Sequence, residues 1–308
     1  MLEIGLSMMV KNEESNIVPC LEPIVDLFRQ VVIIDTGSTD RTRQILQERF
    51  GIETLSAELD PAECYALATP RNRSFGLLDT KWILTLDADE RIDRNELLAV
   101  LALDDEALPS GLFCAWNTDL GKDGVVEDYK LCLFRHGYSH LGLVHDTVQP
   151  SLRESGASAK WCPQMQLRHQ PDLRRTREKQ DWYSRRLACA RARQPGWLRY
   201  HWFTAYMHFQ AGDFGEAAQL LQQVHDGRPP LFPVESLNAS MLLASLTARS
   251  GDRRQTNAVL DDALGFYQQV RDDFEVRVNF RLGPWLAEAA GFAANGKLDA
   301  IVPYRFAY

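Results

Sequence analysis

Two aspartates separated by one residue follow a hydrophobic run at positions 82–86, which reads Trp-Ile-Leu-Thr-Leu. Carboxylates spaced like Asp87 and Asp89 can both face one cation at the end of a strand, and oxygen ligands suit Mg²⁺ or Mn²⁺. Such a cation can bridge two phosphates and offset the charge that develops on a departing nucleoside diphosphate. The pattern Asp-x-Asp is also common in surface turns, so its meaning depends on the residues that accompany it.

A third aspartate, Asp35, follows the β-branched run 31–34 in the same way. At a strand end it can accept hydrogen bonds from a ribose hydroxyl or a base N–H, and Gly37 permits the tight turn that follows. The competing interpretation is a capped junction between a strand and a helix, with Asp40 as the N-cap.

The elements that must position these residues alternate between strands and helices. Strands are predicted at 4–10, 31–34, 52–55 and 82–86. Helical spacing is found at 14–28, 40–50 and 70–78. This alternation predicts an α/β fold with a mixed, mostly parallel sheet, in which ligands bind beyond the carboxyl ends of the strands. Further strand-like segments occur at 112–116, 129–134 and 167–170.

After Pro171 the pattern is helical to the end of the chain. Segments around Gly212 and Gly251 each contain a helix, a Gly-Asp turn and a second helix, with a spacing somewhat longer than the ~34 residues of tetratricopeptide repeats. The sequence therefore predicts two domains, an α/β domain over residues 1–170 and an all-α, tetratricopeptide-like domain over residues 171–308.

Charge and hydropathy exclude some classes of function. The chain of 308 residues carries 34 Lys and Arg against 42 Asp and Glu, a net charge of −8, which argues against a nucleic-acid partner. Its first residues lack the features of a signal peptide, and no run approaches the roughly 18 apolar residues of a membrane span. We expect a soluble, cytoplasmic protein without a membrane span.

Four motifs in order resemble family 2 glycosyltransferases with the GT-A fold. They are Ser-Met-Met-Val-Lys-Asn-Glu-Glu at 7–14, Val-Ile-Ile-Asp-Thr-Gly-Ser-Thr-Asp-Arg-Thr at 32–42, Ala-Thr-Pro-Arg-Asn at 68–72 and Leu-Thr-Leu-Asp-Ala-Asp-Glu at 84–90. The chain looks closest to the branch that opens Ser-Met-Ile-Val-Lys-Asn-Glu-Glu and often carries tetratricopeptide-like helices. The resemblance covers residues 3–150 well and the helical tail loosely.

The resemblance implies roles for individual residues. Asp35 would contact the nucleoside, Arg71 would lie beside the base, and Asp87 and Asp89 would form the acidic pair, with Asp89 the direct metal ligand. Further members of the implied nucleotide pocket are Val10, Asn12 and Glu13.

The segment Gly142-Leu-Val-His-Asp matches a region where the branch usually has His-Glu. His145 is therefore a candidate third metal ligand. His169 falls where the branch also tends to have a histidine after its last strand, which implies a weaker metal or phosphate contact. Direct displacement needs a carboxylate to take the proton of the acceptor. Candidates for this base are Asp146, which adjacency to His145 favours slightly, and the pair Glu127 and Asp128. The resemblance implies inversion at the anomeric carbon.

The resemblance implies a metal-dependent transfer of a hexosyl or N-acetylhexosaminyl group from a nucleotide-diphosphate sugar, with a UDP-sugar as the expected donor and Mn²⁺ or Mg²⁺ as the metal. The acceptor could be a glycan, a peptide or a small molecule, and the helical tail could bind a protein partner or a second copy. A dinucleotide oxidoreductase lacks support because no Gly-x-Gly-x-x-Gly follows the first predicted strand. The remaining alternative is a catalytically silent transferase-like domain that acts as a helical-repeat scaffold.

Overall fold

The computed structural model describes residues 1–172 and 177–303. The described residues divide into two compact units, an α/β unit over 1–172 and a helical unit over 177–303. Within the described part of the chain, no helix is both long and apolar enough to cross a membrane.

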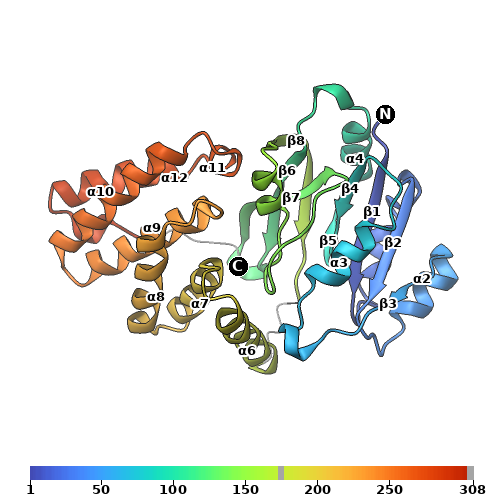
Figure 1. The fold of residues 1–308 in the computed structure, drawn as a ribbon, viewed down its shortest axis with the longest axis horizontal. Coiled ribbons are helices and arrows are strands. Elements are labelled where there is room, and N and C mark those ends of the chain that lie inside the picture. Colours follow the sequence, from blue (N-terminus) through green and yellow to red (C-terminus); the bar gives the residue numbers. More distant parts are fainter. Residues whose placement is uncertain (173–176, 304–308) are drawn as a thin grey trace. The chain divides into compact units, whose positions relative to one another are not determined.

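The α/β unit is built on one eight-stranded sheet (Figure 1). Its strands, in chain order, are β1 (Ile4–Val10), β2 (Gln30–Asp35), β3 (Leu55–Ser56), β4 (Trp82–Thr85), β5 (Glu90–Arg91), β6 (Gly111–Asp119), β7 (Val125–Arg135) and β8 (Ala159–His169). Their spatial order is β3-β2-β1-β4-β7-β6-β8-β5. The pairs β2–β3, β1–β2, β1–β4 and β6–β8 are parallel, and the other three pairs are antiparallel. The predicted fold class, a mixed and mostly parallel GT-A-type sheet followed by an all-α region, is confirmed.

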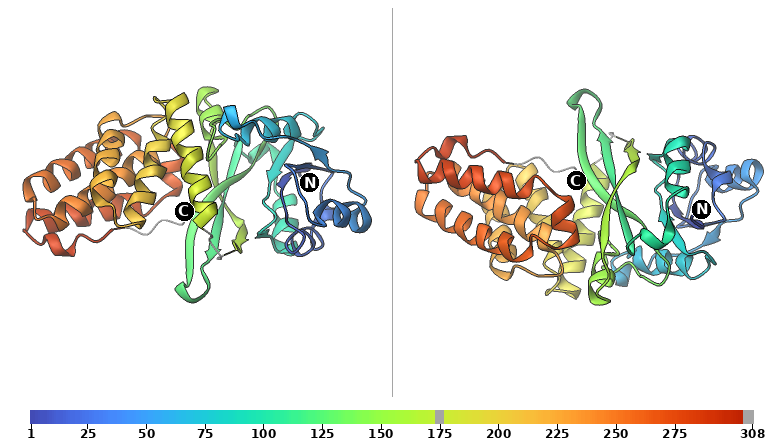
Figure 2. Two further views of the ribbon diagram at one scale, coloured as in Figure 1. Left: turned by 90° about the horizontal axis from the view of Figure 1, so that it is seen from below. Right: turned by 90° about the horizontal axis from the view of Figure 1, so that it is seen from above.

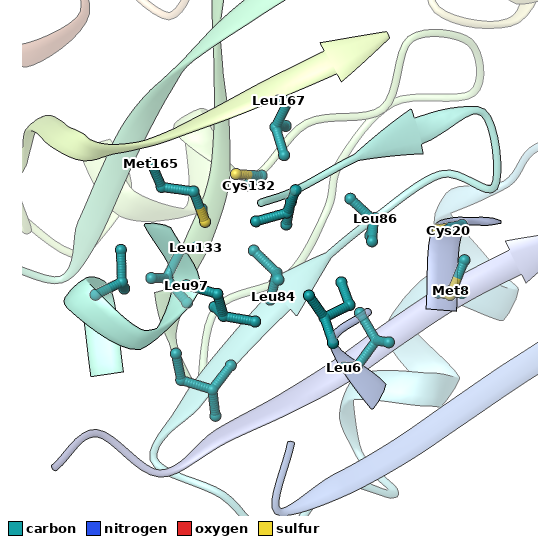
Figure 3. Close-up of a cluster of buried hydrophobic side chains, with 14 of the residues drawn as sticks. Leu6, Met8, Cys20, Leu84, Leu86, Leu97, Cys132, Leu133, Met165 and Leu167 are labelled. Atoms are coloured by element: carbon teal, nitrogen blue, oxygen red, sulfur yellow. The ribbon is translucent and has the colours of Figure 1, made fainter. Parts of the chain in front are cut away.

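Strand β1 lies in the middle of the parallel half and is buried along almost its whole length. Such strands read as continuous hydrophobic runs because helices cover both faces of the sheet. The side chains of Leu6, Leu84 and Leu133 come from β1, β4 and β7, and Leu97 of α4 and Met165 of β8 also belong to this cluster (Figure 3). Burying each such side chain contributes about 1.5–3 kcal/mol, so this layer fixes the strand order on which the site depends.

Short helices connect the strands of the first unit. They are α1 (Ile17–Leu21), α2 (Thr42–Phe50), α3 (Ala68–Phe75), α4 (Arg94–Leu101) and α5 (Gln149–Glu154), with 3₁₀ turns at Val25–Leu27, Pro61–Glu63, Asp105–Ala107 and Gly121–Asp123. The helix predicted over 14–28 is wrong in its extent. Only Ile17–Leu21 is α-helical, because Pro23 lacks the backbone N–H that would continue the hydrogen-bond ladder. The N-cap position of α2 is Arg41, one residue beyond the predicted Asp40.

The helical unit contains antiparallel helix pairs (Figure 2). Its helices are α6 (Arg177–Arg193), α7 (Arg199–Gln210), α8 (Phe214–Gly227), α9 (Pro233–Arg249), α10 (Arg253–Val270), α11 (Phe274–Val278) and α12 (Leu282–Ala294), followed by a 3₁₀ turn at Leu298–Ala300. Helix α8 buries one stripe, formed by Ala217, Leu220, Leu221 and Val224, which is the spacing of a helix face.

Two similar turns join α7 to α8 and α9 to α10. Gly212 and Gly251 have φ angles of +81° and +79°, a left-handed conformation that glycine adopts without steric cost. The aspartates that follow them cap the next helix, since Asp213 accepts from the Glu216 N–H and Asp252 from the Gln255 N–H. The two predicted helix–turn–helix segments are thus present in the structure.

Candidate functional site

Strands β1, β2 and β4 run parallel and end at one edge of the sheet (Figure 1). Val10 is level with Asp35 in the register of β1 and β2, and Ser7 is level with Thr85 in that of β1 and β4. Asp35 and the segment Asp87–Asp89 therefore lie at the same edge, two strand spacings or about 10 Å apart. This is the edge at which open α/β sheets bind ligands.

The loop after β2, residues 35–40, is here named the Asp35 loop. Oδ1 of Asp35 accepts hydrogen bonds from the N–H groups of Gly37 and Ser38, both at 3.0 Å. Gly37 has a φ of +101°, which lets the chain turn back over the carboxylate. Oδ2 of Asp35 is buried and has no hydrogen-bond donor. An unsatisfied buried carboxylate oxygen costs free energy, so it marks a position that a ligand donor would stabilise.

Asn12 joins the Asp35 loop to the end of β1. It has a left-handed φ of +58°, donates from its N–H to Ser38 Oγ at 3.0 Å, and accepts at Oδ1 from the Thr39 N–H at 2.7 Å. The carbonyl of Val10 also accepts from the Thr36 N–H at 3.0 Å. The predicted pocket residues Val10, Asn12 and Asp35 are therefore brought together by one local hydrogen-bond network.

Asp87 is held by two cationic side chains. Lys130 of β7 donates from Nζ to Asp87 Oδ2 at 2.8 Å and to Glu90 Oε1 at 2.7 Å. Nη2 of Arg71 lies 3.8 Å from Asp87 Oδ1. Desolvation would raise the pKa of Asp87, but Lys130 and Arg71 hold this pKa well below its usual range.

Glu90 is fully buried behind Asp87, and its Oε2 accepts from the Asp87 N–H at 2.9 Å. Both oxygens of Glu90 are thus engaged. Burial, with Asp87 as the nearby negative charge, raises the pKa of Glu90 in spite of Lys130. Glu90 and Lys130 were not among the predicted site residues.

Arg71, on the buried face of α3, also binds Asp146. Its Nε lies 3.1 Å from Asp146 Oδ2, and Nδ1 of His140 lies 2.8 Å from the same oxygen. Burial would raise the pKa of Asp146, but Arg71 and His140 hold this pKa well below its usual range. An ionised carboxylate only accepts hydrogen bonds, so His140 carries its proton on Nδ1. Arg71, Asp87, Glu90, Lys130 and Asp146 form a chain of alternating charges, here named the Asp87 cluster.

Asp89 faces a different partner. Its Oδ2 lies 3.3 Å from Nε2 of His169, whose Nδ1 lies 3.1 Å from Thr118 Oγ1. The ring of His169 stacks on Trp116 at 4.8 Å between centroids and 20° between planes. The structure therefore joins Asp89 to His169, the histidine that is predicted to make the weaker metal or phosphate contact.

Glu13 lies near the acidic motif and is half-buried. Its Oε2 accepts from the Asn16 side chain at 2.9 Å, and its N–H donates to Thr42 Oγ1 at 2.7 Å. Burial raises the pKa of Glu13, and the negative charges of Asp89 and Asp87 raise it further.

The predicted base candidates on β7 point to opposite faces of the sheet because side chains alternate along a strand. Asp128 is two residues from Lys130 and directly opposite Trp116 of β6, so these three side chains share one face. Glu127 is opposite Asn117 and belongs to the other face. Lys130 reaches Asp87 and Trp116 stacks on the partner of Asp89, so Asp128 is on the face that carries the acidic motif.

His145 lies in the loop after β7 with a left-handed φ of +52°. The carboxylate groups of Asp87 and Asp89 contact Lys130, Arg71 and His169. Among residues 1–172 and 177–303, no group of three or more His, Cys, Asp or Glu side chains is arranged to hold a metal ion. The predicted ligands therefore do not form a complete cage by themselves.

Comparisons with known proteins agree with the resemblance seen in the motifs. Residues 7–130 match the family described as glycosyl transferase family 2. This segment contains the whole of the Asp35 loop and the acidic motif. A TPR repeat-containing protein of Synechococcus elongatus is 27% identical over 325 residues, which cover 97% of this chain and 73% of that protein.

Two solved structures show weak likeness to the chain. TarS 1–349 of S. aureus in complex with UDP-GlcNAc has a TM-score of 0.43 and 14% identity, over 97% of this chain and 89% of that one. Glucosyl-3-phosphoglycerate synthase of Mycobacterium tuberculosis in complex with Mn²⁺ and UDP-glucose has a TM-score of 0.28 and 19% identity, over 39% of this chain and 45% of that one.

Proposed function

We propose that this protein is a glycosyltransferase that takes a sugar from a nucleotide-diphosphate donor, with a UDP-sugar as the expected donor, and inverts the anomeric carbon. One observation carries the proposal. Oδ2 of Asp35 is buried, has no hydrogen-bond donor and lies at the same sheet edge as Asp87 and Asp89. This edge therefore offers both a hydrogen-bond acceptor for a nucleoside and an acidic motif. The family match over 7–130 supports this interpretation.

The side chains at Asp89 fit a divalent cation that is shared with phosphates. Asp89 offers a partly exposed carboxylate, and His169 offers a ring nitrogen beside it. Mg²⁺ is usually bound by one or two carboxylates together with substrate phosphates and water, so a complete protein cage is not required. Asp89 with His169 would hold the ion, and His145 remains a further candidate. When bound, the ion would offset the charge of the departing diphosphate.

The residues of the chain have separable roles in this proposal. Asp35 accepts hydrogen bonds from the nucleoside, and Arg71 and Lys130 hold Asp87 in place beside the position of the diphosphate. Asp128 takes the acceptor proton, because it shares a face with Lys130 and Trp116. Arg71 and His140 both contact Oδ2 of Asp146. This carboxylate is therefore a weak proton acceptor, and its role is to position Arg71.

The acceptor is proposed to be a glycan, a peptide or a small molecule, and the transferred group a hexosyl or N-acetylhexosaminyl group. Residues 171–308 are proposed as a tetratricopeptide-like domain that binds the acceptor, a partner or a second copy. The two helix–turn–helix segments support this domain assignment.

Thermal unfolding with UDP, GDP, ADP and CDP, each with and without Mn²⁺, tests the proposal. We expect UDP with Mn²⁺ to raise the Tm, because a ligand that binds only the folded state stabilises it. The variant Asp35→Asn should reduce the shift. A matched control is Asp26→Asn, because Asp26 is exposed and precedes β2 at the opposite edge of the sheet.

No shift with any nucleotide would contradict the transferase proposal and favour the scaffold alternative. A positive result leads to a second experiment, in which donor hydrolysis is measured across a panel of nucleotide sugars. This screen identifies base and sugar together. The configuration of the product by NMR then decides whether the anomeric carbon is inverted.

A further inference from the structure

The ammonium of Lys130 lies closer to Asp87 than the guanidinium of Arg71 does. It lies between two carboxylates, at 2.8 Å from Asp87 Oδ2 and 2.7 Å from Glu90 Oε1. We propose that the ammonium of Lys130 occupies the position between Asp87 and Glu90, so that these two carboxylates do not ligate the divalent ion. The inference deepens the proposed function, because it concerns the same acidic motif.

A metal ion could not bridge these two carboxylate oxygens while the ammonium lies between them. Mg²⁺ binds carboxylate oxygens at 2.0–2.1 Å. An ion at that distance from Asp87 Oδ2 and Glu90 Oε1 would take the position that Nζ holds between them. Lys130 and a divalent ion therefore exclude each other at this position.

The remaining oxygens of the pair are also directed away from a shared metal. Oε2 of Glu90 accepts from the Asp87 N–H, and Oδ1 of Asp87 faces Nη2 of Arg71. Asp89, by contrast, contacts a histidine ring nitrogen, which is itself a common metal ligand. Asp87 is thus held by cationic side chains of the protein, whereas Asp89 lies next to a potential metal ligand.

The strand alternation of β7 explains why this lysine is directed to the motif. Lys130 shares its face with Asp128 and is opposite Cys114 of β6. Its side chain is one-quarter exposed, whereas Glu90 is buried. A long, flexible side chain can span from β7 to the end of β4 while keeping part of its stem in apolar contact.

Binding of Mn²⁺ alone, without nucleotide, tests the inference. Isothermal titration and the EPR signal of free Mn²⁺ would give the affinity and stoichiometry for the intact chain and for Lys130→Met, which keeps the length and removes the charge. We expect Lys130→Met to bind Mn²⁺ at least about tenfold more tightly, or at one additional site, since Asp87 and Glu90 lose their internal cation. The double variant Lys130→Met/Glu90→Gln should lose that gain.

Two further variants keep the inference testable if Lys130→Met does not fold. Asp87→Asn should leave Mn²⁺ affinity within about threefold of the unaltered protein, and Asp89→Asn should abolish the binding that the unaltered protein shows. The matched control Lys160→Met changes an exposed lysine of β8 and should change nothing.

The inference is overturned if Lys130→Met binds Mn²⁺ no better than the unaltered protein, or if Asp87→Asn loses as much affinity as Asp89→Asn. These outcomes are separate from failure of the proposed function. A protein that gains Mn²⁺ binding in Lys130→Met but binds no nucleotide diphosphate would support the role of Lys130 and contradict the transferase proposal.

Discussion

The Asp35 loop and the Asp87 cluster lie at one edge of the same sheet, but they satisfy their polar groups in opposite ways. The Asp35 loop uses neutral backbone N–H donors and leaves Oδ2 of Asp35 without a donor. In the Asp87 cluster, Lys130 and Arg71 face both oxygens of Asp87. The Asp35 loop can accept a hydrogen bond from a ligand, whereas the charge of Asp87 is neutralised by cationic side chains of the protein.

The two acidic positions should therefore respond differently to substitution. The change Asp35→Asn keeps an oxygen for the Gly37 and Ser38 N–H groups and alters only the position left for the ligand, so the folded protein should tolerate it well. A change in the Asp87 cluster leaves a buried charge without its partner, which costs stability before any ligand is present.

The largest effect is expected for Asp128→Asn. Removing a general base lowers the rate of the chemical step by about 10²–10⁴-fold. Nucleotide binding should stay close to that of the unaltered protein, because Asp128 is assigned to the acceptor side. Single-turnover kinetics together with a UDP titration would measure both quantities. A variant that loses binding and rate in parallel would contradict the assignment.

The next effect is a loss of stability in Asp146→Asn. Arg71 would remain buried without its closest carboxylate, which costs about 3 kcal/mol. For an α/β unit of this size the Tm should fall by about 6–12 °C. Calorimetry of the ligand-free protein measures the change. An unchanged Tm would show that the Asp87 cluster contributes little to the fold.

The acid limb of stability should change in the same variant. Asp146 has a depressed pKa, so its contribution to stability is complete above the pKa of the unfolded chain, about 3.9, and is lost as the pH falls towards the folded pKa. Between pH 5 and pH 2.5 the unaltered protein should therefore lose more stability than Asp146→Asn. Urea unfolding at several pH values gives both slopes, and parallel slopes would contradict this account.

A smaller effect is expected for Asp35→Asn. One hydrogen bond to a charged acceptor is worth about 1.5–3 kcal/mol, so UDP affinity should fall by about 10- to 150-fold. The Tm of the ligand-free protein should change much less than in Asp146→Asn, because the Gly37 and Ser38 N–H groups can still donate to the amide oxygen. A large loss of Tm here would remove the contrast between the two regions.

The smallest effect is expected for Glu127→Gln. Glu127 is exposed and belongs to the face opposite Asp128, so its replacement should change stability by less than about 0.5 kcal/mol and activity by less than about twofold. Activity and Tm measured beside Asp128→Asn provide the comparison. A loss as large as that of Asp128→Asn would reverse the choice of base.

Much of the parallel half of the sheet can be predicted from sequence. The run Ile4–Val10 matches β1 residue for residue, because a buried parallel strand is hydrophobic on both faces. The position of Asp35 at a strand end was equally visible. The predicted helix over 14–28 is too long. Its apolar periodicity continues past Pro23, but the helical hydrogen bonds of the backbone cannot continue through that residue.

The ion pairs of the site were beyond the reach of sequence analysis. Lys130 binds Asp87 across 43 positions of the chain, and Arg71 binds Asp146 across 75. Periodicity and motif spacing report local structure, whereas these contacts depend on how distant segments pack, as in the pairing of β7 beside β4. Glu90 follows the motif directly, and only its burial distinguishes it from a solvated turn residue.

The hydrogen bonds of Asn12 bear on how fast a donor can enter. Because Asn12 joins the end of β1 to Ser38 and Thr39 in the ligand-free protein, the loop backbone is already ordered around Asp35. Association that needs no loop rearrangement proceeds at rates set by encounter and orientation, and affinity differences then reside in dissociation. Stopped-flow traces for nucleotide binding should accordingly show a single phase whose rate rises linearly with concentration.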